Sequence, residues 1–258
     1  MIKISRDNFP PSDKYLIGVN RGCEKWRVVE NKVLVDYKSN PLIFQNGTYS
    51  FPRHPSYDSW KEELLRAQGI KCCYCEKPIN RGDLEHYRPK QGWQQAKGNS
   101  FNRPGYYWLA YRWKNLLLSC SECNESATKG NLFPIQGTRA TTPRCNLNAE
   151  HSTLLNPYNE EPSNSISFYK SDPIAINNRG KVTIDIFKLK DRGDLAPIRK
   201  DRFDMYELAK STLDYANKGH IKISRSDLKE LQTKLYTAQK AKKPFSGMIK
   251  ENLRQGFL

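Results

Sequence analysis

Two cysteine pairs of equal spacing limit what this chain can fold into. Cys72 and Cys75 form one Cys-x-x-Cys pair and Cys120 and Cys123 form the other, with residues 76 to 119 between them. Two residues between thiolates allow both sulfurs to reach one tetrahedral Zn²⁺ at about 2.3 Å. We therefore expect a closed four-cysteine zinc site. The alternative, a chance packing of thiols, is less favoured.

The intervening segment is longer than the ~15–20 residues of a simple zinc ribbon. A further unit must therefore be inserted between the two pairs. The sequence contains seven cysteines, an odd number, and thiols in the cytosol stay reduced, so a disulfide framework is a poor interpretation. Cys23, Cys73 and Cys145 are expected to be small buried side chains.

The charge balance points to a polyanionic partner. Lysine and arginine number 43 against 27 acidic residues, which gives a net charge of +16 in 258 residues. Basic side chains displace the counterions condensed on phosphates, so this excess favours nucleic acid. The alternatives are a protein that is merely basic and, less favoured, one that binds a membrane surface. No apolar run approaches the ~18 residues of a membrane span, and the N-terminus lacks the apolar region of a signal peptide. We expect a cytoplasmic protein.

The segment before the first cysteine pair is expected to end in a helix. Residues 1–57 are rich in turn-forming residues, and 26–29 and 33–37 are short strand or helix candidates. Ser59 and Glu62 fit a capping box that would begin the helix. Trp60, Leu64 and Ala67 share one face of it, and Gly69 is placed to end it.

Between the cysteine pairs the pattern predicts strand, loop, strand and helix. Residues 83–88 form a strand candidate that stops at Pro89, and 115–119 form a buried one. The aromatic run 106–113 is interpreted as core rather than as a base-stacking platform. Residues 124–129 form a short helix stopped by Gly130. The predicted fold class is α+β.

Within this segment Glu85 and His86 are the residues best suited to acid–base and metal chemistry. An acidic-His dipeptide is usually surface decoration, and Glu150-His151 is interpreted as such a decoy. Position between the two cysteine pairs distinguishes Glu85-His86. Adjacent residues on a regular strand point to opposite faces, so joint action needs a kink, a bulge or the strand's end.

These residues resemble the HNH endonucleases, the ββα-metal nuclease superfamily, whose pattern is a cysteine pair, acid plus His, Asn, a second pair and a final His or Asn. The resemblance implies that His86 is the general base and that Asn115 orients its imidazole. It implies that Glu85 and Asn124 bind the catalytic divalent ion, and that Lys129 contacts the scissile phosphate. At position 85 this chain has Glu, where Asp is commoner in the family. At position 124 it has Asn, where many members have His. An amide oxygen favours Mg²⁺ or Mn²⁺ over Zn²⁺ in the catalytic site.

Longer strings resemble one HNH subfamily over about residues 58–200. They include Glu-His-Tyr-Arg-Pro-Lys at 85–90, Gly-Tyr-Tyr-Trp-Leu-Ala-Tyr at 105–111 and Lys-Gly-Asn-Leu-Phe-Pro at 129–134. The subfamily includes nuclease subunits of Septu anti-phage systems and of some retron systems. The resemblance implies an ATPase partner of the kind called PtuA.

The remainder of the chain carries little chemistry. Residues 132–180 are expected to form loops, with strands at 166–169 and 181–187, and the pattern is helical from 196 onward. The Lys-rich segment 240–243 is either a phosphate contact or a solvated helix end. We divide the chain into a loop-rich region, 1–57, a nuclease domain, 58–195, and a helical region, 196–258, suited to docking a partner.

The sequence leads to one hypothesis and one alternative from another class. The hypothesis is a metal-dependent HNH endonuclease with structural zinc, acting on nucleic acid, with DNA favoured over RNA. The alternative is a non-catalytic zinc-knuckle protein that binds nucleic acid or serves as a scaffold. Convergence of Glu85, His86 and Asn124 on one point discriminates between them.

Overall fold

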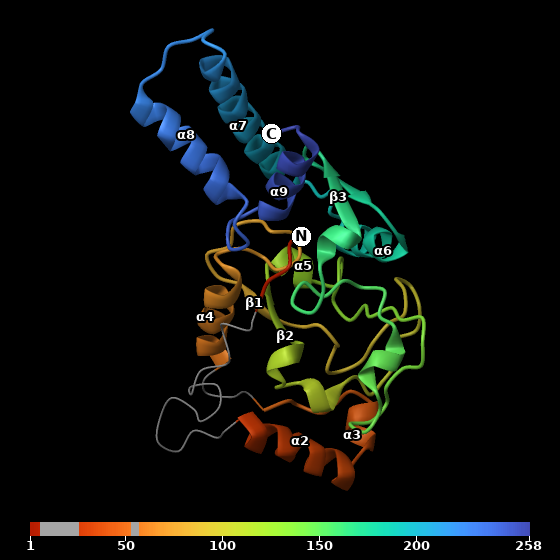
Figure 1. Ribbon diagram of the computed structural model, residues 1–258. Coiled ribbons are helices and arrows are strands. Elements are labelled where there is room, and N and C mark those ends of the chain that lie inside the picture. The colour runs from red at the N-terminus through yellow and green to blue at the C-terminus, as the bar shows by residue number, and fades with distance from the viewer. Residues whose placement is uncertain (6–25, 53–56) are drawn as a thin grey trace. The chain divides into compact units, whose positions relative to one another are not determined.

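The computed structural model describes residues 1–5, 26–52 and 57–258 (Figure 1). Helices are mixed with two separate two-stranded antiparallel sheets, which confirms the predicted α+β class. The chain forms two compact units. We call residues 5–67 and 81–156 the hairpin unit, and residues 1–4, 68–80 and 157–258 the helical unit. These units are defined by contacts alone, so the functional division at 57 and 195 stays a prediction.

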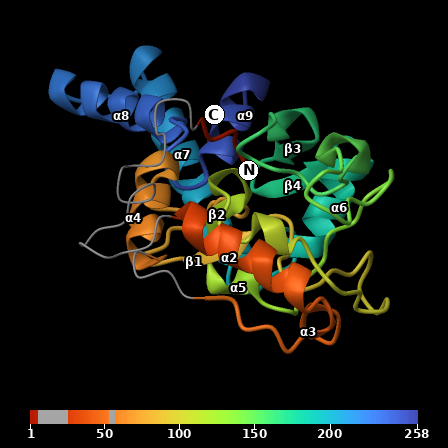
Figure 2. The same ribbon diagram turned by 90° about the horizontal axis from the view of Figure 1, so that it is seen from below.

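The first described helices of the hairpin unit are α2, Trp26–Ser39, and α3, Leu42–Gln45 (Figure 2). The two short segments predicted as strands or helices are thus parts of the single helix α2, which confirms the helix alternative for them. Val29 and Val33 are both buried and lie four residues apart. That spacing puts them on one helical face.

Helix α4, Tyr57–Gln68, delivers the chain to the first cysteine pair. It begins two residues before Ser59, so the predicted capping box is wrong and Ser59 lies within the first turn. Trp60, Leu64 and Ala67 are buried, as their spacing predicted. Gly69 follows the helix at φ +84°, the left-handed conformation expected of a helix-ending glycine.

The centre of the hairpin unit is an antiparallel pair formed by β1, Asp83–His86, and β2, Leu116–Ser119. Both strands were predicted, and every residue of β2 is buried. The register places Glu85 opposite Leu117 and His86 opposite Leu116. Strand β1 therefore ends at His86, three residues before Pro89.

The helix after β2 begins earlier than predicted. Helix α5 spans Ser121–Asn124, and the chain is extended at Glu125. The single hydroxyl proton of Thr128 is shared between the carbonyl oxygens of Glu122 at 2.7 Å and Glu125 at 3.2 Å. These bonds satisfy carbonyls at the end of the helix and turn the chain back, so the predicted helix at 124–129 is replaced by a turn. Gly130 closes it at φ +41°.

The aromatic run lies in the core, as predicted. Residues 106 to 111 are all buried, and Tyr107–Leu109 form a 3-10 helix, η1. Tyr37 of α2 stacks on Tyr107 with 4.1 Å between ring centroids. The other short 3-10 helices of the described chain are η2, Trp113–Asn115, η3, Leu147–Glu150, and η4, Pro162–Asn164.

In the helical unit, β3, Ile166–Tyr169, pairs with β4, Asp172–Ala175, rather than with the segment 181–187. That segment lies in helix α6, Asn178–Phe187, so the predicted strand is wrong. The Asn177 side chain caps the helix by accepting from the Gly180 amide at 3.0 Å. Capping and the burial of Thr183, Ile184 and Phe187 on one face outweigh the strand preference of Val182 and the isoleucines.

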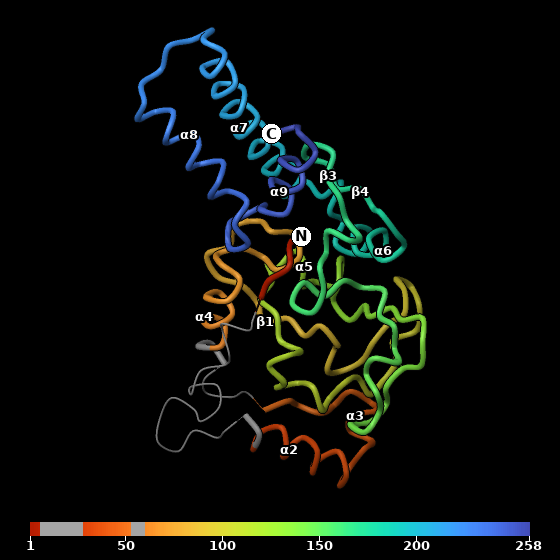
Figure 3. Tube along the Cα trace, viewed as in Figure 1, coloured from red at the N-terminus to blue at the C-terminus, as the bar shows by residue number. Residues whose placement is uncertain are grey.

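Three further helices confirm the predicted helical region. They are α7, Ala196–Asn217, α8, Arg225–Ala238, and α9, Ser246–Gln255. Helices α7 and α8 run side by side (Figure 3). In α7, Phe203 and Leu213 are buried, whereas Leu208 is exposed. Among the described residues, no helix is both long and apolar enough to cross a bilayer.

The cysteines outside the two pairs differ from one another. Cys73 is buried, as predicted. Cys145 is partly exposed, so the prediction of a buried side chain is wrong there. Its partner is the Thr142 hydroxyl at 3.3 Å, in a turn that packs little around it. Cys23 lies outside the described residues.

Candidate metal centre and catalytic cavity

The two cysteine pairs form one buried cluster. The sulfur atoms of Cys72, Cys75, Cys120 and Cys123 all lie within 4.8 Å of one another. In the first pair the Cys72 amide donates to the Lys77 carbonyl at 2.9 Å, which folds the chain into a tight turn. In the second, the amides of Cys123 and Asn124 donate to the Cys120 carbonyl at 3.1 and 3.2 Å.

The cluster suits a thiophilic metal. Sulfurs at ~2.3 Å from a tetrahedral Zn²⁺ are roughly 3.8 Å apart, which is compatible with the observed spread. Four thiolates without a carboxylate or a carbonyl form a soft donor set, which prefers zinc to magnesium or calcium. This group of four cysteines could therefore hold a metal ion such as zinc.

A separate polar cavity of about 380 Å³ lies in the hairpin unit. Glu85 and His86 from the end of β1 line it together with Asn124 from the end of α5. The residues that the sequence selected for the catalytic ion and the base thus border the same space. Its other lining residues are Leu84, Pro89, Lys90, Gln91, Ser126, Gly130 and Asn131.

Glu85 is buried and forms an ion pair with Lys129, which is also fully buried. The same ammonium donates to the His86 carbonyl oxygen at 2.9 Å. Lys129 therefore holds the side chain of one site residue and the main chain of the next. Its predicted contact with a phosphate stays a prediction, and its contacts here are with the protein.

The His86 ring lies 2.9 Å, through Nε2, from the carbonyl oxygen of Ala110. A carbonyl can only accept a hydrogen bond, so Nε2 carries the proton and Nδ1 of a neutral ring is an acceptor. Burial lowers the pKa of the imidazole to about 3, and the positive charge of Lys90 acts in the same direction. The bond to Ala110 opposes them. His86 is therefore neutral near pH 7.

Asn115 bonds to the main chain beside His86. Its Oδ1 accepts from the Arg88 amide at 2.8 Å, and its Nδ2 donates to the Arg88 carbonyl at 3.0 Å and the Leu109 carbonyl at 3.2 Å. The predicted role in orienting the imidazole stays a prediction. The hydrogen bonds of Asn115 to Arg88 act on the segment that follows His86, and the Ala110 carbonyl contacts the ring itself.

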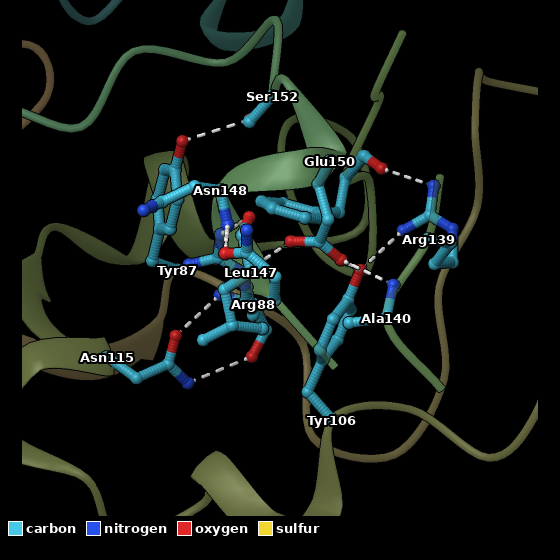
Figure 4. Close-up of polar contacts among 12 residues, drawn as sticks. Tyr87, Arg88, Tyr106, Asn115, Arg139, Ala140, Leu147, Asn148, Glu150 and Ser152 are labelled. Atoms are coloured by element: carbon cyan, nitrogen blue, oxygen red, sulfur yellow. Dashed lines mark hydrogen bonds and ion pairs between the residues drawn. The ribbon is translucent and has the colours of Figure 1, made fainter. Parts of the chain in front are cut away.

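Sequence reasoning missed a polar network centred on Glu150, which was interpreted as a surface decoy. Its side chain is fully buried and is bonded to Arg88, Tyr106 and Ala140 (Figure 4). Lys90, Gln91 and Asn131 were also missed as residues that line the cavity. The available signal was proximity to motif residues, since Lys90 and Gln91 follow Pro89 and Asn131 follows Gly130.

Fold and site together define an α+β protein with a buried four-cysteine cluster that could hold a metal ion such as zinc. No protein-family model and no solved structure matches the chain. Among curated proteins, it is similar to a Septu protein PtuB of Bacillus mycoides (strain KBAB4), with 36% identity over 143 residues, which is 52% of this chain and 48% of the relative. A Septu protein PtuB of Bacillus thuringiensis is 26% identical over 133 residues, 50% of this chain and 40% of the relative.

The chain therefore spans about half the length, or less, of these curated relatives. The similarity confirms the predicted closeness to a Septu protein, PtuB. The assignment to the HNH family stays a prediction.

Proposed function

We propose that this chain is a metal-dependent HNH endonuclease that hydrolyses phosphodiester bonds in nucleic acid. One observation carries the proposal: Glu85, His86 and Asn124 line a single cavity although Asn124 is 38 positions from His86 in the sequence. The nuclease hypothesis requires these three residues to border one space, whereas the non-catalytic alternative leaves that to chance.

His86 supplies the base. With the Nε2 proton bonded to Ala110, the lone pair on Nδ1 is left to accept a proton from the attacking water. The water oxygen then bonds to phosphorus while the bond from phosphorus to the leaving 3′ oxygen breaks, and that oxygen takes up a proton. A neutral imidazole at pH 7 is the required starting state, and burial favours it.

The donor set fits a hard divalent ion at the same cavity. Glu85 offers carboxylate oxygens and Asn124 an amide oxygen, the ligands that Mg²⁺ and Mn²⁺ prefer. An ion bound there would act as a Lewis acid, stabilising the negative charge that develops on the phosphate and the leaving oxygen. To hold the ion, the Glu85 carboxylate would have to share or exchange its pairing with Lys129.

The ion pair between Glu85 and Lys129 also favours a second candidate function. A carboxylate that already has a buried cationic partner is what a non-catalytic zinc-knuckle protein would contain. The two candidates differ in metal binding: the nuclease binds Mn²⁺ at Glu85, and the scaffold does not. Electron paramagnetic resonance titration of the zinc-loaded chain with Mn²⁺ separates them.

The decisive test of the nuclease is His86→Ala. We expect a loss of Mn²⁺-dependent cleavage of at least about 100-fold, because removing a general base costs 10²–10⁴-fold. Zinc content and the far-ultraviolet circular dichroism spectrum should be unchanged. His220→Ala, at an exposed turn after α7, is the matched control and should keep wild-type activity. Full activity of His86→Ala would contradict the mechanism.

We further propose that the chain is the nuclease effector of an anti-phage defence system. Its similarity to proteins named Septu protein PtuB supports this role. The proposed partner is an ATPase subunit resembling PtuA. Protection of cells against phage should then need both His86 and the co-encoded ATPase. Protection by this chain alone would count against the partnership.

A further inference from the structure

The carboxylate of Glu150 is completely buried and is bonded on both oxygens. Oε2 accepts from Arg88 Nε at 2.7 Å, and Oε1 accepts from the Tyr106 hydroxyl at 2.5 Å and the Ala140 amide at 3.1 Å (Figure 4). Arg139 in turn donates to the Tyr106 oxygen at 2.8 Å. Such a fully satisfied group is rigid, because a change in its position would break several bonds at once.

Arg88 is fixed at its other end as well. Its Nη2 donates to the Leu147 carbonyl at 3.2 Å, and its main-chain amide and carbonyl are both bonded by the Asn115 side chain. The preceding residue is held by the same region of the chain, since the Tyr87 hydroxyl donates to the Leu154 carbonyl at 2.6 Å and lies 2.9 Å from the Ser152 hydroxyl.

Tyr87 and Arg88, which these hydrogen bonds hold in place, lie between two residues of the cavity wall. Tyr87 and Arg88 connect His86 to Pro89. His86 and Pro89 both line the cavity. A shift of the Arg88 main chain therefore moves the cavity wall on either side of it. The backbone here lies beyond strand β1: the Tyr87 amide donates to the Asn115 carbonyl at 2.9 Å, and side chains supply the further bonds that hold Arg88.

Stability alone does not account for the ion pair between Arg88 and Glu150. A buried ion pair is often no more stabilising than apolar side chains of the same volume, because desolvation offsets the attraction. What such a pair supplies is a fixed geometry. We propose, resting on the proposed nuclease function, that Glu150 is a positioning residue that acts through Arg88 to hold His86 in its working orientation at the cavity.

The test follows the His86 ring directly in the full-length, zinc-loaded chain. Four histidines are present, so long-range ¹H–¹⁵N spectra of ¹⁵N-histidine-labelled protein are simple, and His86→Gln identifies the His86 signal. The wild type should show the Nε2-protonated form at pH 7. In Glu150→Ala we expect a mixture of tautomers and a fall in turnover of about 100-fold, because a displacement near 1 Å costs that much. Glu150→Gln keeps one acceptor oxygen for Arg88, so its tautomer ratio and its turnover should lie between those of Glu150→Ala and of the wild type.

Two further variants make the result decisive. Glu251→Ala is the matched control, since Glu251 is also buried and accepts from the Ser167 hydroxyl at 2.8 Å and from Gln255 at 2.6 Å in the helical unit. It should leave the His86 spectrum unchanged. If Glu150→Ala does not fold, Arg88→Lys is tested in its place. A lysine side chain cannot donate to the Glu150 carboxylate and to the Leu147 carbonyl together.

The outcomes separate the two proposals. A folded Glu150→Ala or Arg88→Lys variant with the wild-type His86 spectrum would overturn the positioning role, whatever its activity. An inactive wild type in which Glu150→Ala still disturbs the His86 ring would overturn the nuclease function and leave the positioning role intact.

Discussion

At the scale of single residues, the central problem is how adjacent Glu85 and His86 serve one cavity. Alternation along a strand would send them to opposite faces. Strand β1 ends at His86, so its regular geometry does not continue beyond that residue. Lys129 lies against both, pairing with the Glu85 carboxylate and donating to the His86 carbonyl. Their arrangement thus depends on a lysine more than forty positions away.

The ion pair predicts the behaviour of Lys129→Met. Removing the cation leaves the buried Glu85 carboxylate uncompensated, so we expect a loss of about 3–5 kcal/mol in the free energy of unfolding. If Glu85 binds Mn²⁺, the ion replaces the missing charge. Added Mn²⁺ should then raise the melting temperature of the variant more than that of the wild type, measured by differential scanning fluorimetry.

A surface pair provides the control for this measurement. Lys200 pairs with Asp204 on the exposed face of α7. Since exposed pairs contribute little to stability, Lys200→Met should melt close to the wild type with or without Mn²⁺. A Lys129→Met variant as stable as the wild type would show that the buried pair contributes no net stability.

At the scale of elements, helix capping and side-chain packing determined the secondary structure of segments whose intrinsic preference pointed to another structure. The segment 181–187 has the β-branched residues of a strand, yet it is helical because Asn177 caps it and one face is buried. In α2, two segments that were predicted separately lie in one helix, and Val29 and Val33 are buried on one face of it. Neither result follows from local preference alone.

Gly180→Ala tests whether packing overrides propensity in α6. Intrinsic preference alone predicts a gain of ~0.8–1 kcal/mol, because alanine is the best helix former. A Cβ at this position would, however, overlap the carbonyl oxygen of Ser165. We therefore expect a loss of ~1–3 kcal/mol, as for other overpacked sites, measured by guanidinium denaturation.

Gly193 serves as the comparison, because in the described part of the chain no atom beyond its two sequence neighbours lies within 4 Å of the Cβ that it would gain. Gly193→Ala should be nearly neutral. A stabilised Gly180→Ala variant would mean that β3 and its neighbours yield easily to the added methyl group.

The cysteine turns predict a definite metal content. The purified chain should contain about one zinc ion, measured by inductively coupled plasma mass spectrometry. Cys120→Ala should abolish it and lower the melting temperature, since a structural site contributes its binding energy to folding. Cys73→Ala is the control: Cys73 is buried beside the first pair but is not one of the four clustered cysteines, so zinc should remain. Equal zinc content in both variants would rule out the four-cysteine site.

At the scale of the whole molecule, we expect the net charge of +16 to govern the proposed binding of nucleic acid. Each neutralised phosphate adds about 0.9 to the slope of log affinity against log salt. With six contacts, affinity for duplex DNA should fall about a thousandfold between 50 and 200 mM salt, measured by fluorescence anisotropy with the cleavage-deficient His86→Ala variant. Affinity that is insensitive to salt would contradict phosphate binding.

The same measurement decides the role of the segment 240–243, where Lys240, Lys242 and Lys243 are exposed. Replacing all three with glutamine should lower the slope by about 2.7 if each contacts a phosphate. An unchanged slope would make the segment a solvated helix end.

The sequence by itself determined the cysteine pairs, the strands β1 and β2, the aromatic core and the helical C-terminal region, because spacing and hydrophobic periodicity are local properties. It also selected Glu85, His86 and Asn124. Only the tertiary structure showed that these three line one cavity, that Lys129 is buried against Glu85, and that Glu150 is a core residue rather than a decoy. The burial of a side chain and the identity of its bonding partners depend on segments that are distant in the chain. The dipeptide Glu150-His151 by itself therefore does not indicate which residues pack against it.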